Sequence, residues 1–143
     1  PPGSVLDVGC GSGILGVAAL RLGAATLRAV DVEPAAAEAT TANAAANGVG
    51  GRTHADTTPL DELAGDHDLV LANVLAPILV ALADGLVART APGGRLVVAG
   101  FLEDREAGVL TALDAAATRA GRSVAPLARR DEDGWSALAL TVT

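Results

Sequence analysis

The chain has 143 residues and a formal net charge of −7, and half of its residues are apolar. This length supports one domain with its own hydrophobic core, and the acidic balance disfavours nucleic-acid binding through a broad basic face. No apolar run reaches the roughly 18–20 residues that are needed to span a membrane. The single cysteine, Cys10, cannot form an internal disulfide, which agrees with a reducing compartment, and we expect a cytoplasmic protein.

Strand-like and helix-like segments alternate along the chain, a pattern that predicts a mostly parallel sheet covered by helices on both faces. The expected strands cover residues 5–8, 26–32, 52–55, 68–72, 95–99, 123–128 and 136–142. The expected helices cover residues 14–22, 34 to about 47, 77 to about 90 and 103–120, with a weak helical turn at 57–64. Turns are expected at 91–94 and 130–134. Because a short loop joins the last two strands, they should form an antiparallel hairpin at one edge.

The most informative segment follows the first expected strand and reads Asp-Val-Gly-Cys-Gly-Ser-Gly over residues 7–13. Three glycines between a strand and a helix let the backbone approach a ligand closely. A dinucleotide-binding fingerprint would need its third glycine at position 14, which is Ile14. The G-x-G-x-G spacing, with a carboxylate two residues ahead, resembles the loop by which class I methyltransferases hold S-adenosylmethionine.

Candidate ligand-binding residues fall at the carboxyl ends of the expected parallel strands, where open α/β sheets bind their ligands. The loop glycines are Gly9, Gly11 and Gly13. Their amides and the space around them would fit the amino-acid part of the cofactor, with Asp7 holding its ammonium directly or through water. Asp31 ends the second strand and would accept hydrogen bonds from both ribose hydroxyls, because carboxylate oxygens only accept.

Two further candidates have structural alternatives. Asp56 follows the third strand and would accept a hydrogen bond from the adenine amino group, or it would be a helix N-cap ahead of Thr57 and Thr58. Asn73 ends the fourth strand and would offer an acceptor and donors beside the reacting methyl, or it would be a turn residue or cap ahead of the next helix.

The remaining candidates for chemistry are three side chains to which we assign structural roles. Cys10 should be a small buried side chain, and His54 and His67 ordinary loop or strand-edge histidines. No histidine and cysteine cluster has zinc spacing and no nucleophile lies next to a base, so we expect no metal site.

With these residues in view, the chain resembles the catalytic domain of the methyltransferases that modify ribosomal large-subunit protein eleven. The resemblance runs from Val5 to the end of the chain. It rests on VLDVGCGSGILGVAALRLGA at 5–24, DVEPAA at 31–36 with NAAANG at 43–48, LVLANVLA at 69–76, GGRLVVAGFL at 93–102 and DGW at 133–135. The sequence around Asn73 distinguishes this family from related enzymes. Those that methylate glutamine or adenine carry Asn-Pro-Pro-Tyr or Asp-Pro-Pro-Tyr at this place.

The resemblance implies one S-adenosylmethionine-dependent methyltransferase domain over residues 1–143. Its fold would be the three-layer, Rossmann-like α/β fold of class I methyltransferases, with a mostly parallel seven-stranded sheet and an antiparallel C-terminal hairpin. It implies cofactor contacts at Gly9, Asp31 and Asn73. It also implies methylation of lysine ε-amino groups and an N-terminal α-amino group of protein eleven, with Asn73 as the catalytic residue. We expect a monomer with no nucleic-acid or membrane partner.

Two other functions stay open at this point: another class I N-methyltransferase of a protein or small molecule, and a cofactor-binding fragment without turnover. The family also has a cofactor-contacting threonine before the first strand and a separate N-terminal domain that binds the ribosomal protein. The chain contains no methionine and opens Pro1-Pro2-Gly3 directly before its first strand. We therefore expect a fragment that lacks both features.

Overall fold

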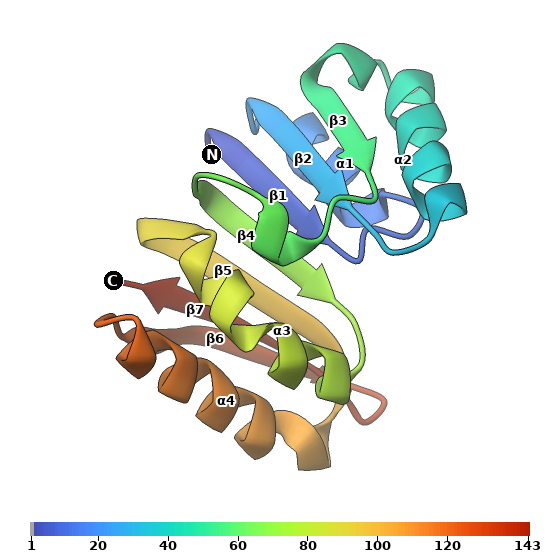
Figure 1. Ribbon diagram of the computed structural model, residues 1–143. Helices are drawn as coiled ribbons and strands as arrows, with labels where there is room; N and C mark the ends of the chain where they lie inside the picture. Colours follow the sequence, from blue (N-terminus) through green and yellow to red (C-terminus); the bar gives the residue numbers. More distant parts are fainter. Residues whose placement is uncertain (1) are drawn as a thin grey trace.

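A seven-stranded sheet in the order β3-β2-β1-β4-β5-β7-β6 lies between two layers of helices in the computed structural model, which describes residues 2–143 (Figure 1). The strands are β1 (Ser4–Val8), β2 (Thr26–Val30), β3 (Thr53–Asp56), β4 (His67–Asn73), β5 (Thr90–Leu102), β6 (Val124–Glu132) and β7 (Trp135–Val142). The helices are α1 (Ile14–Arg21), α2 (Pro34–Ala46), α3 (Ala76–Ala88) and α4 (Glu106–Arg119), with short 3-10 helices η1 (Gly50–Arg52), η2 (Leu60–Glu62) and η3 (Glu103–Arg105).

The strand pairing confirms the predicted topology. Strands β3, β2, β1, β4 and β5 pair in parallel, whereas β7 pairs antiparallel with both β5 and β6. The chain first runs outward from β1 to β3 and then returns to β4 on the other side of β1. This reversal places a topological switch point at the carboxyl ends of β1 and β4, where ligands bind in sheets of this kind.

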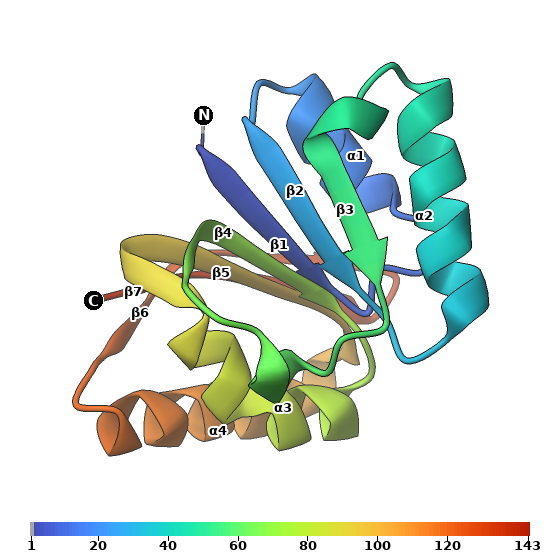
Figure 2. The same cartoon turned by 45° about the horizontal axis from the view of Figure 1, so that its top comes forward.

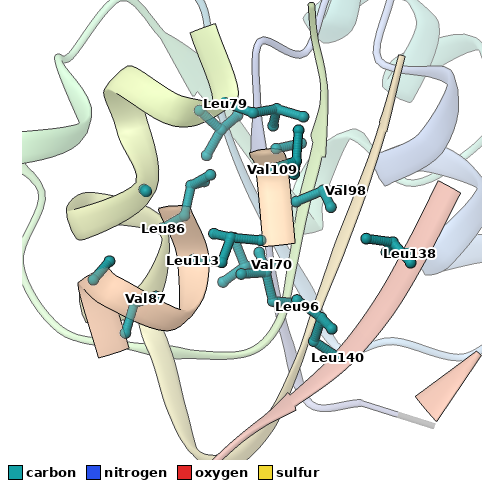
Figure 3. Close-up of a cluster of buried hydrophobic side chains, with 14 of the residues drawn as sticks. Val70, Leu79, Leu86, Val87, Leu96, Val98, Val109, Leu113, Leu138 and Leu140 are labelled. Atoms are coloured by element: carbon teal, nitrogen blue, oxygen red, sulfur yellow. The ribbon is translucent and has the colours of Figure 1, made fainter. Parts of the chain in front are cut away.

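Each face of the sheet has its own hydrophobic core, because successive side chains of a strand point to opposite faces. Val5 on β1 packs with α1 and α2, whereas Leu6 packs with α3 and α4. Figure 2 shows the two helix pairs on opposite sides of the sheet. The core under α3 and α4 is the larger one, and Figure 3 shows side chains such as Leu86 and Leu113 pointing from these helices toward the strands. Within residues 2–143, no helix has the length and apolar character that crossing a membrane requires.

Three local predictions differ from the structure. The expected turn at 91–94 lies inside β5, where Thr90 pairs with His67 and Arg95 already pairs with Leu69, so the intervening residues form an irregularity within the strand. The expected helical turn at 57–64 is reduced to η2. Strand β6 continues four residues beyond its predicted end, to Glu132, and only Asp133 and Gly134 form the hairpin turn. Both turn residues have positive φ angles, 51° and 82°, which matches the strong preference of two-residue hairpins for Asp-Gly.

Candidate active site

The glycine loop connects β1 to α1 and is tied to the end of the neighbouring strand β2. The backbone N–H groups of Gly9 and Cys10 both donate to the Val30 carbonyl, at 2.8 and 3.1 Å. Gly9 has a φ of 72°, and a Cβ atom there would lie 2.5 Å from the Cγ1 atom of Val74. The loop therefore needs glycine at this position for its conformation and for its contact with the segment after β4.

Asp31 lies directly after β2, and one of its carboxylate oxygens holds the glycine loop. Its Oδ2 atom accepts a hydrogen bond from the Gly11 N–H and its Oδ1 atom accepts one from the Glu33 N–H, each at 3.0 Å. Because each carboxylate oxygen accepts about two hydrogen bonds, both atoms keep capacity for a ligand donor. The structure thus brings Asp31 to the glycine loop, as the sequence predicted.

A cavity of about 220 Å³ opens beside Asp31 and is almost entirely apolar. Its walls come from the ends of β1 and β2, the segment before η2, and α3. Val32, which follows Asp31, is 88 % exposed, and Ile78 on α3 is 46 % exposed. An apolar slot next to a hydrogen-bonding carboxylate is suited to a ligand that joins a flat ring to a hydroxylated group.

Asp7 lies beneath the glycine loop and is only 2 % exposed. Its Oδ2 atom has no hydrogen-bond partner among residues 2–143 and lies 3.2 Å from the place where a Cβ atom on Gly16 of α1 would be. Burial raises the pKa of Asp7 to about 6; the nearby Asp31 carboxylate adds to this rise, and the Gly16 backbone amide opposes it. The predicted contact with a ligand ammonium would give this buried oxygen a partner.

Asp56 ends β3, and residues of the chain itself engage its carboxylate. Arg28 contacts both oxygens at 2.9 and 3.0 Å, and the Thr58 N–H donates to Oδ1 at 3.0 Å. His54 lies 3.1 Å from Oδ2. Partial burial alone would raise the pKa of Asp56, but the hydrogen bonds from Thr58 and the ion pair with Arg28 hold it well below its usual range. The Asp56 carboxylate therefore closes a turn through Thr58 and does not cap the following helix η2, whose N-cap residue is Pro59.

Asn73 is exposed and lies in a second hollow, of about 400 Å³, between the ends of β4 and β5 and the β6–β7 hairpin. The other lining residues are Ala99, Gly100, Arg130, Glu132, Trp135, Ser136 and Ala137. Sequence reasoning identified Trp135 only through a motif, and it missed Arg130, Glu132 and Ser136. The signal that places them here is the hairpin register, in which Arg130 pairs with Ala137 and Glu132 pairs with Trp135.

Three side chains expected to be structural lie outside both cavities. Cys10 is buried in the core under α1 and α2, and Thr40 donates a hydrogen bond to its sulfur at 3.2 Å. His54 is on the edge strand β3. His67 begins the central strand β4, at the opposite end of the strands from the glycine loop. Across residues 2–143, the structure holds no group of three or more His, Cys, Asp or Glu side chains that would suit a metal ion.

The fold brings the glycine loop, Asp31 and Asn73 together at the carboxyl ends of the parallel strands. Asp7 lies below the loop, and Asp56 contacts Arg28. The unpartnered Asp7 oxygen suits a cation, Asp31 suits a pair of hydroxyls, and the apolar cavity suits a base. These donor and acceptor properties fit an adenosyl amino acid.

Comparison with known proteins identifies similar chains. The family model of the "Ribosomal protein L11 methyltransferase (PrmA)" matches residues 1–141. A ribosomal protein L11 methyltransferase of Citrifermentans bemidjiense is 49% identical over 113 residues, which make up 79% of this chain and 37% of the relative. The crystal structure of ribosomal protein L11 methylase from Lactobacillus delbrueckii subsp. bulgaricus aligns with a TM-score of 0.88 and 30% identity, over 98% of this chain and 70% of that chain.

A more distant structure shows how widely the fold is used. An RNA methyltransferase from Salinibacter ruber, in complex with S-adenosyl-L-homocysteine, aligns with a TM-score of 0.71 at 20% identity, over 97% of this chain and 80% of that chain. Identity this low shows a common fold and leaves the acceptor undecided.

Proposed function

The chain belongs to the ribosomal protein L11 methyltransferase family, and from this premise we propose that it is the catalytic domain of an S-adenosylmethionine-dependent protein N-methyltransferase. The family predicted from the sequence is confirmed. The acceptors we propose are lysine ε-amino groups and the N-terminal α-amino group of ribosomal protein L11. Because the chain spans only 37% of the relative's length, the activity and substrate of the whole protein belong to this proposal.

The position of Asn73 carries the proposal. The segment that begins at Asn73 is in contact with both parts of the site: Val74 packs against Gly9 of the glycine loop, and Asn73 itself lines the hollow beside Trp135. A methyl donor held by the loop and an amine held in the hollow would therefore meet at this segment. Such placement of two reactants is a main source of rate acceleration in group transfer.

The first cavity and the residues around the glycine loop would hold the cofactor. Asp31 would accept hydrogen bonds from the ribose hydroxyls, the apolar cavity would take the adenine, and Asp7 would face the ammonium directly or through water. When bound, S-adenosylmethionine supplies an electrophilic methyl group on a sulfonium sulfur. The complex of the Salinibacter ruber enzyme, which has the same fold, supports this choice of cofactor.

The residues of the hollow would prepare the acceptor. A lysine side chain is mostly protonated at pH 7, and its nitrogen must lose a proton before a lone pair is free to attack. The Glu132 carboxylate would attract the cation whereas the Arg130 guanidinium would oppose it, and the proton would leave to solvent through the open hollow. Among the described residues, no histidine lines this hollow. The Asn73 carboxamide oxygen would then accept a hydrogen bond from the amine. Trp135 would pack against the aliphatic part of the lysine side chain that carries this amine.

Two substitutions separate cofactor binding from methyl transfer. Asp31→Ala should weaken binding of S-adenosylhomocysteine by at least about tenfold, because it removes charge-assisted acceptors. Asn73→Ala should leave that affinity unchanged but lower methyl transfer to purified ribosomal protein L11 by about 100-fold or more. Calorimetry measures the first quantity and mass spectrometry of the L11 product the second. Asn47→Ala, at an exposed asparagine after α2, is the matched control and should change neither.

The outcome distinguishes the functions left open by the sequence. A chain that binds S-adenosylhomocysteine but methylates other amines in preference to L11 would be another N-methyltransferase of this class. A chain that binds it and methylates nothing would be a cofactor-binding fragment. Undiminished methylation by Asn73→Ala would contradict the role of that residue. The cytoplasmic location and the monomeric state stay predictions.

A further inference from the structure

The charged residues at the end of β6 divide between the two faces of the sheet, because successive side chains of a strand point to opposite faces. Arg129 and Asp131 lie on the face that α4 covers, and they contact each other at 2.8 Å. Arg129 also contacts both oxygens of the Glu106 carboxylate on α4, at 3.0 and 3.2 Å. The buried Ser136 hydroxyl donates a hydrogen bond to Asp131. The charges on this face are therefore paired within the chain.

Arg130 and Glu132 lie on the opposite face, and both line the hollow that contains Asn73. In the hairpin register Arg130 pairs with Ala137 and Glu132 pairs with Trp135, and these two partners line the same hollow. Both charged side chains are exposed. The ion pairs among residues 2–143 include neither of them. The wall of the hollow therefore carries one guanidinium and one carboxylate that are free to bind a ligand.

The two charges have the spacing of an extended peptide. Arg130 and Glu132 are two residues apart on one face of a strand, so they are separated by about 6.5 Å along it. An extended substrate segment repeats at the same distance on its own face. A lysine that passes Glu132 would thus place the side chain two positions away next to Arg130. A guanidinium binds carboxylates through paired N–H donors, so the side chain that fits there is acidic.

We propose that Arg130 determines specificity for the acceptor, by binding an acidic side chain of the substrate protein two residues from the methylated lysine. This assignment gives a role to a positive charge that would otherwise only repel a lysine from the hollow. The preferred acceptor is then a lysine with an acidic neighbour on the same face of an extended segment. The inference rests on the proposed function, since it concerns the acceptor of the same site.

A pair of peptides tests the inference by fluorescence. Trp135 is the only tryptophan of the chain and lines the hollow, so its emission reports binding there. The 143-residue chain is titrated with acetyl-Glu-Gly-Lys-Gly-Glu-amide and with the matched peptide in which glutamine replaces both glutamates. Wild type should bind the glutamate peptide about threefold to fivefold more tightly, the range of an exposed ion pair. The difference should shrink as salt is added, because salt screens exposed charges.

Two variants of Arg130 and one control locate the preference. Arg130→Gln should bind the two peptides equally, and Arg130→Glu should bind the glutamine peptide more tightly. Arg95→Gln is the matched control and should keep the wild-type preference. Arg95 is an exposed arginine that pairs with Leu69 near the amino end of β4, away from the hollow. Each variant is compared with itself on two peptides, so a uniform change in affinity or stability cancels.

Equal affinity of wild type for the two peptides would overturn the inference, as would an undiminished preference in Arg130→Gln. A wild-type chain with no saturable response to either peptide overturns it as well. The proposed function is judged separately, by whether the wild-type chain binds S-adenosylhomocysteine.

Discussion

Replacing Asp7 by asparagine should change how the stability of the chain depends on pH. The pKa of this buried carboxyl is raised from 3.8 to about 6 in the folded chain. The folded state therefore holds a proton that the unfolded state has already lost, and stability declines as pH rises from about 4 to about 6. The rise spans roughly two pH units, and each corresponds to about 1.4 kcal/mol, so ionised Asp7 lowers the free energy of unfolding by about 3 kcal/mol above pH 6.

Urea unfolding of wild type and Asp7→Asn between pH 4 and pH 8 measures this quantity. The difference in free energy of unfolding should move by about 2–3 kcal/mol in favour of the variant across that range. Using the change with pH, rather than the value at one pH, cancels any fixed effect of placing an amide in this site. Asp114→Asn, on the exposed side of α4, controls for the loss of a carboxylate. A difference that stays flat with pH, or that moves toward wild type, would refute the reasoning about Asp7.

Two further predictions concern the loop and the core. Gly9→Ala should abolish measurable binding of S-adenosylhomocysteine, because the new Cβ atom would lie 2.5 Å from the Val74 side chain. Gly48→Ala should keep this binding, because Gly48 has a nearly equal φ of 73° but open space around it. Calorimetry measures the affinity of both variants, and equal affinities would contradict the packing argument. Leu113→Ala should lower the free energy of unfolding by about 2–5 kcal/mol, because Leu113 is 1 % exposed in the core under α4, yet leave cofactor affinity unchanged. A loss of affinity in this variant, measured while it is still folded, would show that the core under α4 influences the distant loop.

The order of strands and helices follows from the sequence because each is a local pattern. Pro34 and Pro77 stand in the first turns of α2 and α3, and Asp133-Gly134 forms the turn of the hairpin. Irregularities that depend on a partner strand are not local. The four residues after Thr90 lie within β5 because Arg95 pairs with Leu69 on β4 and Gly94 pairs with Val142 on β7, and no pattern around residue 91 contains that information.

The candidate site likewise contains residues that local patterns predict and residues that depend on strand pairing. Asp31 and the glycine loop are recognisable from spacing, and the structure brings them together. The contacts of Asp56 depend on Arg28, which is distant in sequence and reaches it only because β2 and β3 are neighbours. Likewise, Glu132 reaches the hollow of Asn73 only through the register of the hairpin. Sequence spacing identifies residues on one strand end, whereas residues contributed by strand pairing require the sheet itself.

The edge strand β6 has a consequence for the behaviour of the molecule in concentrated solution. A strand of nine residues with one free side is a template on which another chain can add a strand and begin aggregation. In β6, Pro126 has no N–H to offer, the pairing is irregular between Pro126 and Ala128, and the strand ends in a run of charges from Arg129 to Glu132. Each of these features opposes the addition of a further strand. Arg130 and Glu132, which line the hollow, thus also disfavour the addition of a further strand at this edge of the sheet.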